Sequence, residues 1–535
     1  MTEHATSFTG VRAARPARAA LLAATISLLV PSAHGRADCT LRQSAAAAGV
    51  DVGAAVGPHL IDGDPEYGPV LTREFSSVTA ENVMKWQPLQ PTPGVYDFAG
   101  ADQLVDFAEN SGMAVRGHTL IWNQQLVDST PDWVEAITDP TALRAAMADH
   151  ITTVVTRYAG RVDAWDVVNE PLETGGSALY ENHFFQVLGP GYIAEALELA
   201  HAADPDALLF INDVLVSLAG PKFDALLALV QDLLAAGAPL HGVGIQGHYL
   251  FPPDPVQLQA NIAALAATGV IVEITELDIL LGGGGTLDEK RQRQADYYFG
   301  VFSACLAVPG CQRVTTWGFT DRYTWIDSFI GPGLEPLLLD VDYDRKLAYF
   351  AVRDALQLAA GVSDRPLAGR KLKLIDSAAA VDDTKLVLRS RDGLVAPPPP
   401  GGAGDPRFAG ATLRLLNPSS GEEAQLELPA EGWKGLGRPG GSSGYRFTDP
   451  GDGPCSRVVV QPGRLVARCT RGGIGFTLDE ASQGTVSATL QLGCDSVQCV
   501  EFGGTVLADT GSAGSGTGRF VAKNAAAGAG CPTPY

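Results

Sequence analysis

The sequence predicts a (β/α)8 barrel followed by a smaller all-β domain. Between about residues 45 and 360, eight short apolar runs alternate with longer segments of helical period. Strands that alternate with helices at this spacing form a parallel sheet with right-handed crossovers, and eight such units in roughly 300 residues fit a closed barrel. From about residue 362 the pattern changes to short alternating runs separated by Gly, Pro and Asp, which is typical of an all-β module.

The expected elements follow from these patterns in chain order. The barrel strands are expected at 50–56, 76–80, 114–120, 162–168, 207–211, 243–247, 270–275 and 313–316. The helical patterns between them include 101–110, 141–158, 192–202, 222–236, 255–267 and 287–306. A linker is expected near 360–370, and the strands after it include 385–388, 412–416, 458–461, 464–467 and 485–492. The proline-rich stretch 397–402 is expected to be a loop inside this module.

The first 37 residues have the pattern of a secretory signal peptide. Three arginines precede the apolar run 19–30, and small residues follow it. The run is too short to span a bilayer comfortably, and no other stretch is expected to form a transmembrane helix. The sequence therefore predicts a secreted protein, extracellular or at the cell surface. Its parts are a signal peptide (1–37), a barrel (38–361) and a C-terminal all-β module of unknown role (362–535).

Export implies an oxidising compartment, in which the eight cysteines can pair. Cys305 and Cys311 bracket one short loop, so a disulfide is expected between them. The connectivity of the other six stays open: Cys39, Cys455, Cys469, Cys494, Cys499 and Cys531.

The formal charge of −22 excludes partners that are themselves polyanions. Nucleic acid and anionic membrane surfaces would be repelled. A neutral polymer such as a polysaccharide is compatible with this charge.

Two glutamates lie where two apolar, β-branched-rich runs end in polar clusters. Glu170 belongs to residues 165–171 (WDVVNEP), and Glu276 belongs to residues 272–278 (VEITELD). A buried parallel strand has this pattern when its carboxyl end reaches an active site. Hydrolysis of a glycosidic bond needs one carboxyl group to protonate the leaving oxygen and a second to attack the anomeric carbon or activate water. A lone glutamate is more often an ordinary surface carboxylate, but the pair in this context predicts a glycoside hydrolase.

Polar and aromatic residues follow the other expected strands as well. A single histidine or tryptophan at a strand end is usually satisfied packing, but residues of this kind at seven consecutive strand ends indicate a site. These residues are Glu81, Asn82, Lys85, Trp86, His118, Trp122, Asn169, Asn212, Asp213, Gln246, His248, Asp278 and Trp317.

The barrel region resembles the family-10 glycoside hydrolases, the family of endo-β-1,4-xylanases. The motifs that carry this resemblance are 79–86 (TAENVMKW), 116–122 (RGHTLIW), 165–171, 242–248 (GVGIQGH), 274–278 (ITELD), 315–321 (TTWGFTD), Trp325 and 336–340 (PLLLD). The resemblance implies a secreted, retaining enzyme that cleaves internal bonds of xylan or xylo-oligosaccharides. No cofactor and no metal are expected. No stable membrane insertion is expected either, and a monomer is the expectation, although the sequence itself leaves the oligomeric state open.

By this resemblance Glu170 is the general acid/base and Glu276 the nucleophile, with Asp278 in support. Pro171 disfavours the helical region for Glu170, so an extended backbone is expected there. Asn169 can hydrogen-bond the sugar 2-hydroxyl. The implied substrate-binding residues are Glu81, Asn82, Lys85, Trp86, His118, Trp122, Asn169, Gln246, His248, Trp317 and Trp325.

The same chemistry predicts opposite protonation states for the two glutamates. Hydrogen bonds from His248, oriented by Asp278, are expected to keep Glu276 ionised. The charge on Glu276 then raises the pKa of Glu170, which has to be protonated at the start of the cycle.

The resemblance also bears on substrate choice. Trp325 is expected to crowd the space that the hydroxymethyl group of glucose needs and xylose does not. A steric difference of one such group is worth about 1–3 kcal/mol, so xylan is favoured over cellulose without excluding it.

Two positions depart from the family pattern. Asn123 follows Trp122 where His is common, and Val214 follows Asp213 where Tyr is common. Asn can still hydrogen-bond a hydroxyl group, whereas Val can neither stack on a sugar ring nor donate a hydrogen bond. The leaving-group side of the cleft is therefore expected to differ from that of the family.

Two other functions are compatible with the same residues. One is a barrel with mixed xylanase and cellobiosidase activity, and the other is a catalytically silent glycan-binding barrel. Release of reducing sugar from xylan separates the second from the first. The sequence leaves open the preference among xylan types, the tolerance of branches and the ligand of the C-terminal module.

Overall fold

The computed structural model describes residues 39–124, 129–249, 254–360, 363–377, 384–402, 404–449, 451, 453–470, 473–494, 496–511 and 517–528. The expected signal peptide and Cys531 lie outside these residues. No helix among the described residues is long and apolar enough to cross a membrane.

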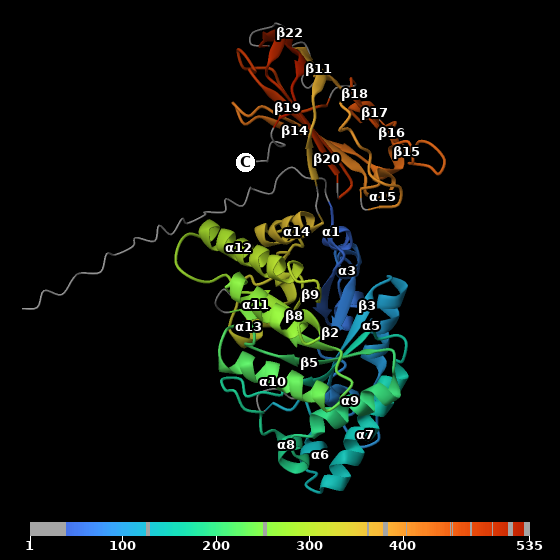
Figure 1. The fold of residues 1–535 in the computed structure, drawn as a ribbon, viewed down its shortest axis with the longest axis vertical. Helices are drawn as coiled ribbons and strands as arrows, with labels where there is room; N and C mark the ends of the chain where they lie inside the picture. Colours follow the sequence, from blue (N-terminus) through green and yellow to red (C-terminus); the bar gives the residue numbers. More distant parts are fainter. Residues whose placement is uncertain are drawn as a thin grey trace, which may run out of the picture.

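Within the described residues, eight parallel strands form a closed barrel, which confirms the predicted fold (Figure 1). Neighbouring strands follow the chain from β1 to β6, β9 pairs with β1, β8 with β9, and pairing between β6 and β8 closes the ring. A short β7 adds to the outer end of β8. The strands are β1 (Asp51–Val56), β2 (Ser77–Ala80), β3 (Ala114–Ile121), β4 (Ala164–Asn169), β5 (Leu208–Asp213), β6 (Gly242–Ile245), β7 (His248–Tyr249), β8 (Ile271–Ile279) and β9 (Cys311–Thr316).

Each of the eight barrel strands overlaps its predicted range, and β8 shows the largest difference. The sequence predicted that this strand ends at residue 275, but it continues to Ile279. The reason is an extra pairing, in which His248 of β7 lies opposite Asp278 of β8. Glu276 and Asp278 are therefore held inside the sheet rather than in a loop that follows it.

Helices surround the barrel, and the six predicted ranges agree with the structure to within two residues at each end. Local signals set their starts: Asp139 caps α7 before Pro140, and Thr286 forms a capping box with Glu289 at α12. The helices are α1 (Leu41–Ala48), α2 (Pro58–Gly63), α3 (Tyr67–Glu74), α4 (Trp86–Leu89), α5 (Ala99–Asn110), α6 (Asp132–Glu135), α7 (Pro140–Arg157), α8 (His183–Leu188), α9 (Tyr192–Ala203), α10 (Pro221–Ala235), α11 (Pro255–Ala266), α12 (Leu287–Leu306), η1 (Asp321–Tyr323), α13 (Ile326–Phe329) and α14 (Leu347–Ala359).

The C-terminal part is all-β, as predicted, and its two sheets share one apolar core. One sheet has the order β10-β20-β19-β13-β14, and the other has the order β15-β16-β17-β18-β12-β11-β22-β21. The elements are β10 (Ser363–Pro366), β11 (Gly369–Ser377), β12 (Lys385–Ser390), α15 (Pro406–Ala409), β13 (Ala411–Leu416), β14 (Glu423–Leu428), η2 (Ala430–Gly432), β15 (Trp433–Gly435), β16 (Tyr445–Phe447), β17 (Cys455–Gln461), β18 (Arg464–Cys469), β19 (Val486–Leu492), β20 (Ser496–Phe502), β21 (Thr505–Thr510) and β22 (Thr517–Ala525).

The connection between the barrel and this module is shorter than predicted. The predicted linker at 360–370 contains β10 and the start of β11, so the sheets begin almost directly after α14. The proline-rich stretch 397–402 is a loop between β12 and α15, as predicted.

Trp433 is buried in the core, and its indole N–H donates to the Leu428 carbonyl. Its ring is therefore not a surface platform for a sugar.

Disulfides connect both parts of the chain. Cys305 and Cys311 are bonded, as predicted, between the end of α12 and the start of β9. Cys455 pairs with Cys469 across β17 and β18. Cys39, just before α1, pairs with Cys494, just after β19, and Figure 1 shows the β module beside α1 and α14. The barrel and the module are thus joined by this bond as well as by the chain after α14.

Candidate active site

The predicted site residues come together at the carboxyl ends of the barrel strands. Glu170 follows β4, and Glu276 lies near the end of β8. Both residues hydrogen-bond Asn212 of β5 and Gln246 in the turn after β6, each through its backbone N–H to one and its carboxylate to the other. The two segments identified from the sequence therefore face one site.

Glu170 has a backbone that the sequence did not predict. Its φ is 52°, in the left-handed region, so the expected extended conformation was wrong. Its N–H donates to the Asn212 carbonyl at 2.7 Å, which holds this uncommon conformation in place. One side-chain oxygen accepts from Gln124 at 2.8 Å, and the other accepts from Gln246 at 3.2 Å.

Glu276 is almost fully buried, and both of its oxygens accept hydrogen bonds. Asn212 Nδ2 donates to Oε1 at 2.7 Å, and His248 Nε2 donates to Oε2 at 2.9 Å. His248 Nδ1 donates in turn to Asp278 at 2.8 Å, and Trp325 Nε1 donates to the same Asp278 oxygen at 2.9 Å. The chain of contacts fixes the orientation of the Glu276 carboxylate.

Asn212 connects the two halves of the site. Its amide group also donates to Asn169 Oδ1 at 2.8 Å, and the same oxygen accepts from Gln246 at 3.3 Å. Gly244 makes room for it, because a Cβ there would lie 2.1 Å from Asn212 Oδ1. The sequence placed Asn212 at a strand end but did not predict its contact with Glu276.

The two carboxyl groups have pKa values displaced in opposite directions. Burial raises the pKa of Glu170, and the negative charge of Glu276 adds to this effect. Burial alone would also raise the pKa of Glu276, but the hydrogen bond from His248 and the nearby histidine charges hold it below its usual range. The opposite displacements widen the pH range in which Glu276 is ionised while Glu170 is protonated.

His248 carries the positive charge that this arrangement needs. Burial would lower its pKa, but the charge of Asp278 and the hydrogen bonds to Asp278 and Glu276 raise it to about 10. The imidazolium ring therefore lies between two carboxylates and donates a hydrogen bond to each.

A second layer of charge lies beneath the site. Arg116 of β3 is buried, forms an ion pair with Asp166 and donates to Glu273 at 2.8 Å. Asp166 also accepts from His118 Nδ1 at 3.0 Å. These contacts fix His118, whose ring meets the edge of Trp317 at a centroid distance of 5.1 Å.

The loop after β2 supplies a polar cluster. Lys85 donates to Asn82 at 2.7 Å, and its ammonium lies 5.0 Å from the ring centre of Trp122. Asn82 donates to Glu81 at 3.3 Å. Burial lowers the pKa of Lys85, while the charges of Glu276 and Glu81 act in the opposite direction.

The tryptophans do not all have the predicted placement. Trp122 and Trp325 are partly exposed, and Trp317 is 8% exposed with its ring against His118 and His248. Trp86 is only 1% exposed and stacks on His150 at a centroid distance of 4.0 Å. Trp86 therefore belongs to the packing between α4 and α7, and its ring offers no face to a sugar.

The two departures from the family pattern have different surroundings. Asn123 donates to Glu135 at 2.5 Å and accepts from the His183 backbone at 3.0 Å, so its amide group holds neighbouring loops. Val214 lies at the start of the loop after β5 and is partly buried. Gln124, which donates to Glu170, has no sequence signal that would have identified it.

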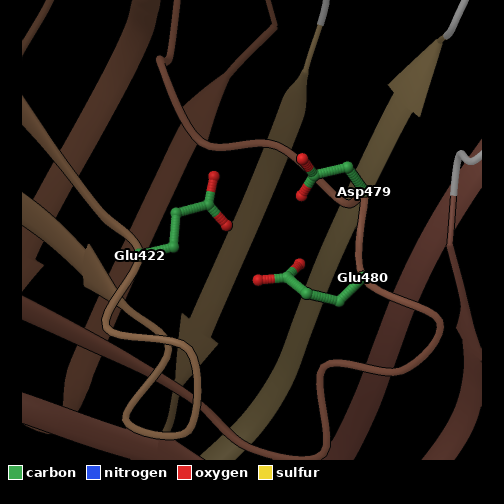
Figure 2. Close-up of side chains that lie close together, drawn as sticks. All are labelled: Glu422, Asp479 and Glu480. Atoms are coloured by element: carbon green, nitrogen blue, oxygen red, sulfur yellow. The ribbon is translucent and has the colours of Figure 1, made fainter.

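The described residues contain one group of carboxylates that could hold a metal ion, and it lies in the β module. Figure 2 shows Glu422, Asp479 and Glu480 with their carboxylates turned toward one another, with one ligand atom from each within 4.8 Å. The Thr477 N–H donates to Glu422, its hydroxyl donates to Asp479, and Gln483 donates to Glu480. These bonds account for the arrangement, and the group has no contact with the barrel site.

Comparison with known proteins identifies the barrel region. A family model described as glycosyl hydrolase family 10 matches residues 40–355, up to the last barrel helix. Endo-1,4-beta-xylanase A of Phanerodontia chrysosporium is 41% identical over 277 residues, which are 51% of this chain and 66% of that protein. An endo-1,4-beta-xylanase of Agaricus bisporus is 37% identical over 295 residues, which are 55% and 87% of the two chains.

Solved structures agree with this match. Xylanase 10B from Thermotoga maritima has a TM-score of 0.58 and 32% identity, and the match covers 61% of this chain and all of that one. Xylanase 10B from Thermotoga petrophila, solved with xylobiose, has a TM-score of 0.57 and 31% identity over 60% of this chain and 98% of that one.

Proposed function

The chain belongs to glycosyl hydrolase family 10, and on this basis we propose that it is a secreted, retaining endo-β-1,4-xylanase. The observation that carries the proposal is the pair of carboxyl groups with opposite pKa displacements at the ends of β4 and β8. The xylanase relatives support xylan or xylo-oligosaccharides as the substrate.

In the first step of this mechanism, Glu276 attacks the anomeric carbon while protonated Glu170 gives its proton to the leaving oxygen. The bond from the anomeric carbon to that oxygen breaks, and a covalent glycosyl ester forms on Glu276. His248 and Asn212 hold the attacking carboxylate in one orientation before the reaction begins.

In the second step, Glu170 is ionised and acts as the base. It removes a proton from water, the water oxygen attacks the anomeric carbon, and Glu276 leaves as a carboxylate. Formation of the ester removes the negative charge of Glu276, which lowers the pKa of Glu170 and prepares it for this role. The enzyme returns to its starting protonation state after each cycle.

We assign sugar binding to the polar and aromatic residues around the pair. Asn169 is the candidate partner of the 2-hydroxyl group, and Lys85, Glu81 and Asn82 form the candidate glycone site. Trp86 is left out of the set because it is buried in packing. The proposed set is Glu81, Asn82, Lys85, His118, Trp122, Asn169, Gln246, His248, Trp317 and Trp325.

Trp325 supports a preference for xylose over glucose. Its indole N–H is tied to Asp278, so its ring is anchored beside the nucleophile and resists displacement by a larger sugar. One hydroxymethyl group is worth about 1–3 kcal/mol, so a weaker cellobiosidase activity is compatible with this site.

We propose the following division of the chain. Residues 1–37 are the signal peptide, 38–361 the catalytic barrel and 362–535 the β module. The disulfides between described residues support export to an oxidising compartment.

Azide rescue with an aryl xylobioside that carries a good leaving group tests the mechanism. Glu170→Ala still forms the glycosyl ester, because this leaving group needs no protonation, and azide then releases a β-glycosyl azide. Glu276→Ala cannot form the ester, and azide enters from the vacated α face to give the α-product. Nuclear magnetic resonance of the products distinguishes the two.

Three outcomes would contradict the proposal. Reversed azide stereochemistry in the two variants would overturn the roles of the glutamates, and inversion by the intact enzyme would overturn the retaining mechanism. Binding of xylan without release of reducing sugar would identify a silent glycan-binding barrel instead.

A further inference from the structure

A buried ion pair lies directly beside the proposed acid/base residue. Asp213, the last residue of β5, is fully buried and forms an ion pair with Lys222 at 2.8 Å. Lys222 lies in the first turn of α10, and its side chain is only 10% exposed. Neither residue makes a hydrogen bond to Glu276, so the catalytic contacts described above do not account for the pair.

Asp213 holds the chain that carries Glu170. One of its oxygens accepts from the Leu172 N–H at 3.1 Å, two residues beyond Glu170. The preceding residue, Asn212, accepts from the Glu170 N–H at 2.7 Å. Two consecutive residues of β5 thus fix the backbone on both sides of the Glu170 side chain.

This double anchor is needed because the Glu170 backbone is in an uncommon conformation. A non-glycine residue with φ near 52° costs of the order of 1 kcal/mol or more and persists only where the surroundings impose it. Lys222 in turn keeps Asp213 in place, since a buried carboxylate without a counter-charge would be protonated or would move toward water.

Lys222 also borders a cavity at the surface. It lines a cavity of about 430 Å³ between residues 174–177, in the loop after β4, and residues 215–223, which follow β5. None of the proposed sugar-binding residues lines this cavity, so Lys222 connects Asp213 to the loops after β4 and β5 rather than to the sugar site.

We propose that the Asp213–Lys222 ion pair positions Glu170 and adjusts its acidity, so that both members are positioning residues for the general acid/base step. This inference rests on the proposed function, because it assigns a task to the pair within that mechanism.

The charges of Lys222 and Asp213 act on the acidity of Glu170 as this proposal requires. The charge of Lys222 acts against burial and lowers the pKa of Glu170. Burial raises the pKa of Asp213 to about 6, and the charge of Glu170 contributes to this rise. A negative charge on either acid therefore disfavours ionisation of the other.

Other charged groups face Glu170 from several elements. Glu276 lies on β8, Lys222 on α10, Asp213 on β5 and Lys85 after β2. Only Lys222 and Asp213 can be changed without altering a group that is assigned to the nucleophile or to sugar binding.

The test measures kcat/KM against pH for the full-length enzyme on xylopentaose, whose leaving group needs protonation. Lys222→Met removes a positive charge that lowers the pKa of Glu170. This variant is therefore expected to move the alkaline limb of the pH profile to higher pH. Asp213→Asn removes a negative charge but keeps an acceptor for Leu172, and it is expected to move the same limb to lower pH. Lys222→Arg keeps the charge and is expected to leave the limb in place.

The loss of kcat/KM in Lys222→Met should depend on the leaving group of the substrate. Lys222→Met is expected to lower kcat/KM on xylopentaose about tenfold at its own optimum, because a looser Glu170 is misplaced for proton transfer. Formation of the glycosyl ester from an aryl xylobioside with a good leaving group is expected to change little. Circular dichroism checks that each variant folds. If Lys222→Met does not fold, the shift of the alkaline limb in Asp213→Asn still tests the inference.

The inference would be overturned if the alkaline limb of the pH profile were the same in all variants. It would also be overturned if activity fell equally on xylopentaose and on the aryl xylobioside without any shift of that limb. Those results would make the pair purely structural while the wild-type enzyme still cleaves xylopentaose. Failure of the wild type to cleave xylopentaose would instead overturn the proposed function, and the inference with it.

Discussion

His150 makes the stability of the barrel sensitive to acid. It lies on α7, is fully buried and stacks on Trp86 with the two rings nearly parallel. Neither ring nitrogen forms a hydrogen bond of good geometry with another described residue. Burial lowers the pKa of His150 to about 3, and an interaction with the Leu120 backbone offsets only part of this effect.

The sign and size of the effect follow from proton linkage. The unfolded chain binds a proton at His150 below pH 6.5, whereas the folded protein stays neutral there until about pH 3. The unfolded state is therefore favoured progressively as the pH falls from 6.5 toward 3. At pH 4.5 the penalty is two pH units at about 1.4 kcal/mol each, or about 3 kcal/mol.

His150→Phe removes this penalty and keeps a ring against Trp86. The difference in unfolding free energy between the variant and the wild type should rise by about 3 kcal/mol when the pH is lowered from 7.5 to 4.5. For a barrel of this size the corresponding change in relative Tm is about 4 °C. Thermal unfolding followed by tryptophan fluorescence measures it, since every tryptophan except Trp433 lies in the barrel.

His150→Leu serves as a second variant. It leaves a poorer stack on Trp86 and should be less stable than His150→Phe at every pH, but its difference from the wild type should depend on pH in the same way. A constant difference between pH 7.5 and 4.5 for both variants would refute the reasoning.

Three further predictions concern the site and the module. Val214→Tyr should lower KM modestly for longer xylo-oligosaccharides, because a ring adds a stacking face on the leaving-group side; unchanged kinetics would exclude a role for this position. Asp278→Asn should move the acid limb of kcat/KM to higher pH, because His248 loses the charge that keeps it protonated beside Glu276; an unmoved limb would contradict this. Deletion of the residues after 365, combined with Cys39→Ser to avoid a free thiol, should leave hydrolysis of soluble xylo-oligosaccharides largely unchanged; loss of most activity in a folded barrel would show that the module supports the site.

The sequence predicted the barrel well because buried parallel strands carry a strong signal. Runs such as the one before Glu170 are apolar on both faces and end in polar residues, so their position and direction can be inferred from the chain alone. The length of β8 could not be predicted, since it depends on its pairing with β7, a segment of two residues.

The site was predicted less completely where side-chain direction matters. Lys85 and Trp86 are adjacent in one motif, yet Lys85 turns toward Trp122 while Trp86 is buried against α7. Sequence adjacency does not reveal this division, because it depends on the start of the short helix α4 at Trp86. The conformation of Glu170 was missed for a related reason: Pro171 disfavours helix but leaves the left-handed region open.

The bond between Cys39 and Cys494 has a consequence for damage by proteases. It joins residues that are 455 positions apart, so almost the whole chain forms one covalent ring. A single cut in any loop between these cysteines opens the ring without separating the pieces. A nicked enzyme should therefore run as one species on a non-reducing gel and as two after reduction. The barrel and the module would in this way stay together after the first cleavage.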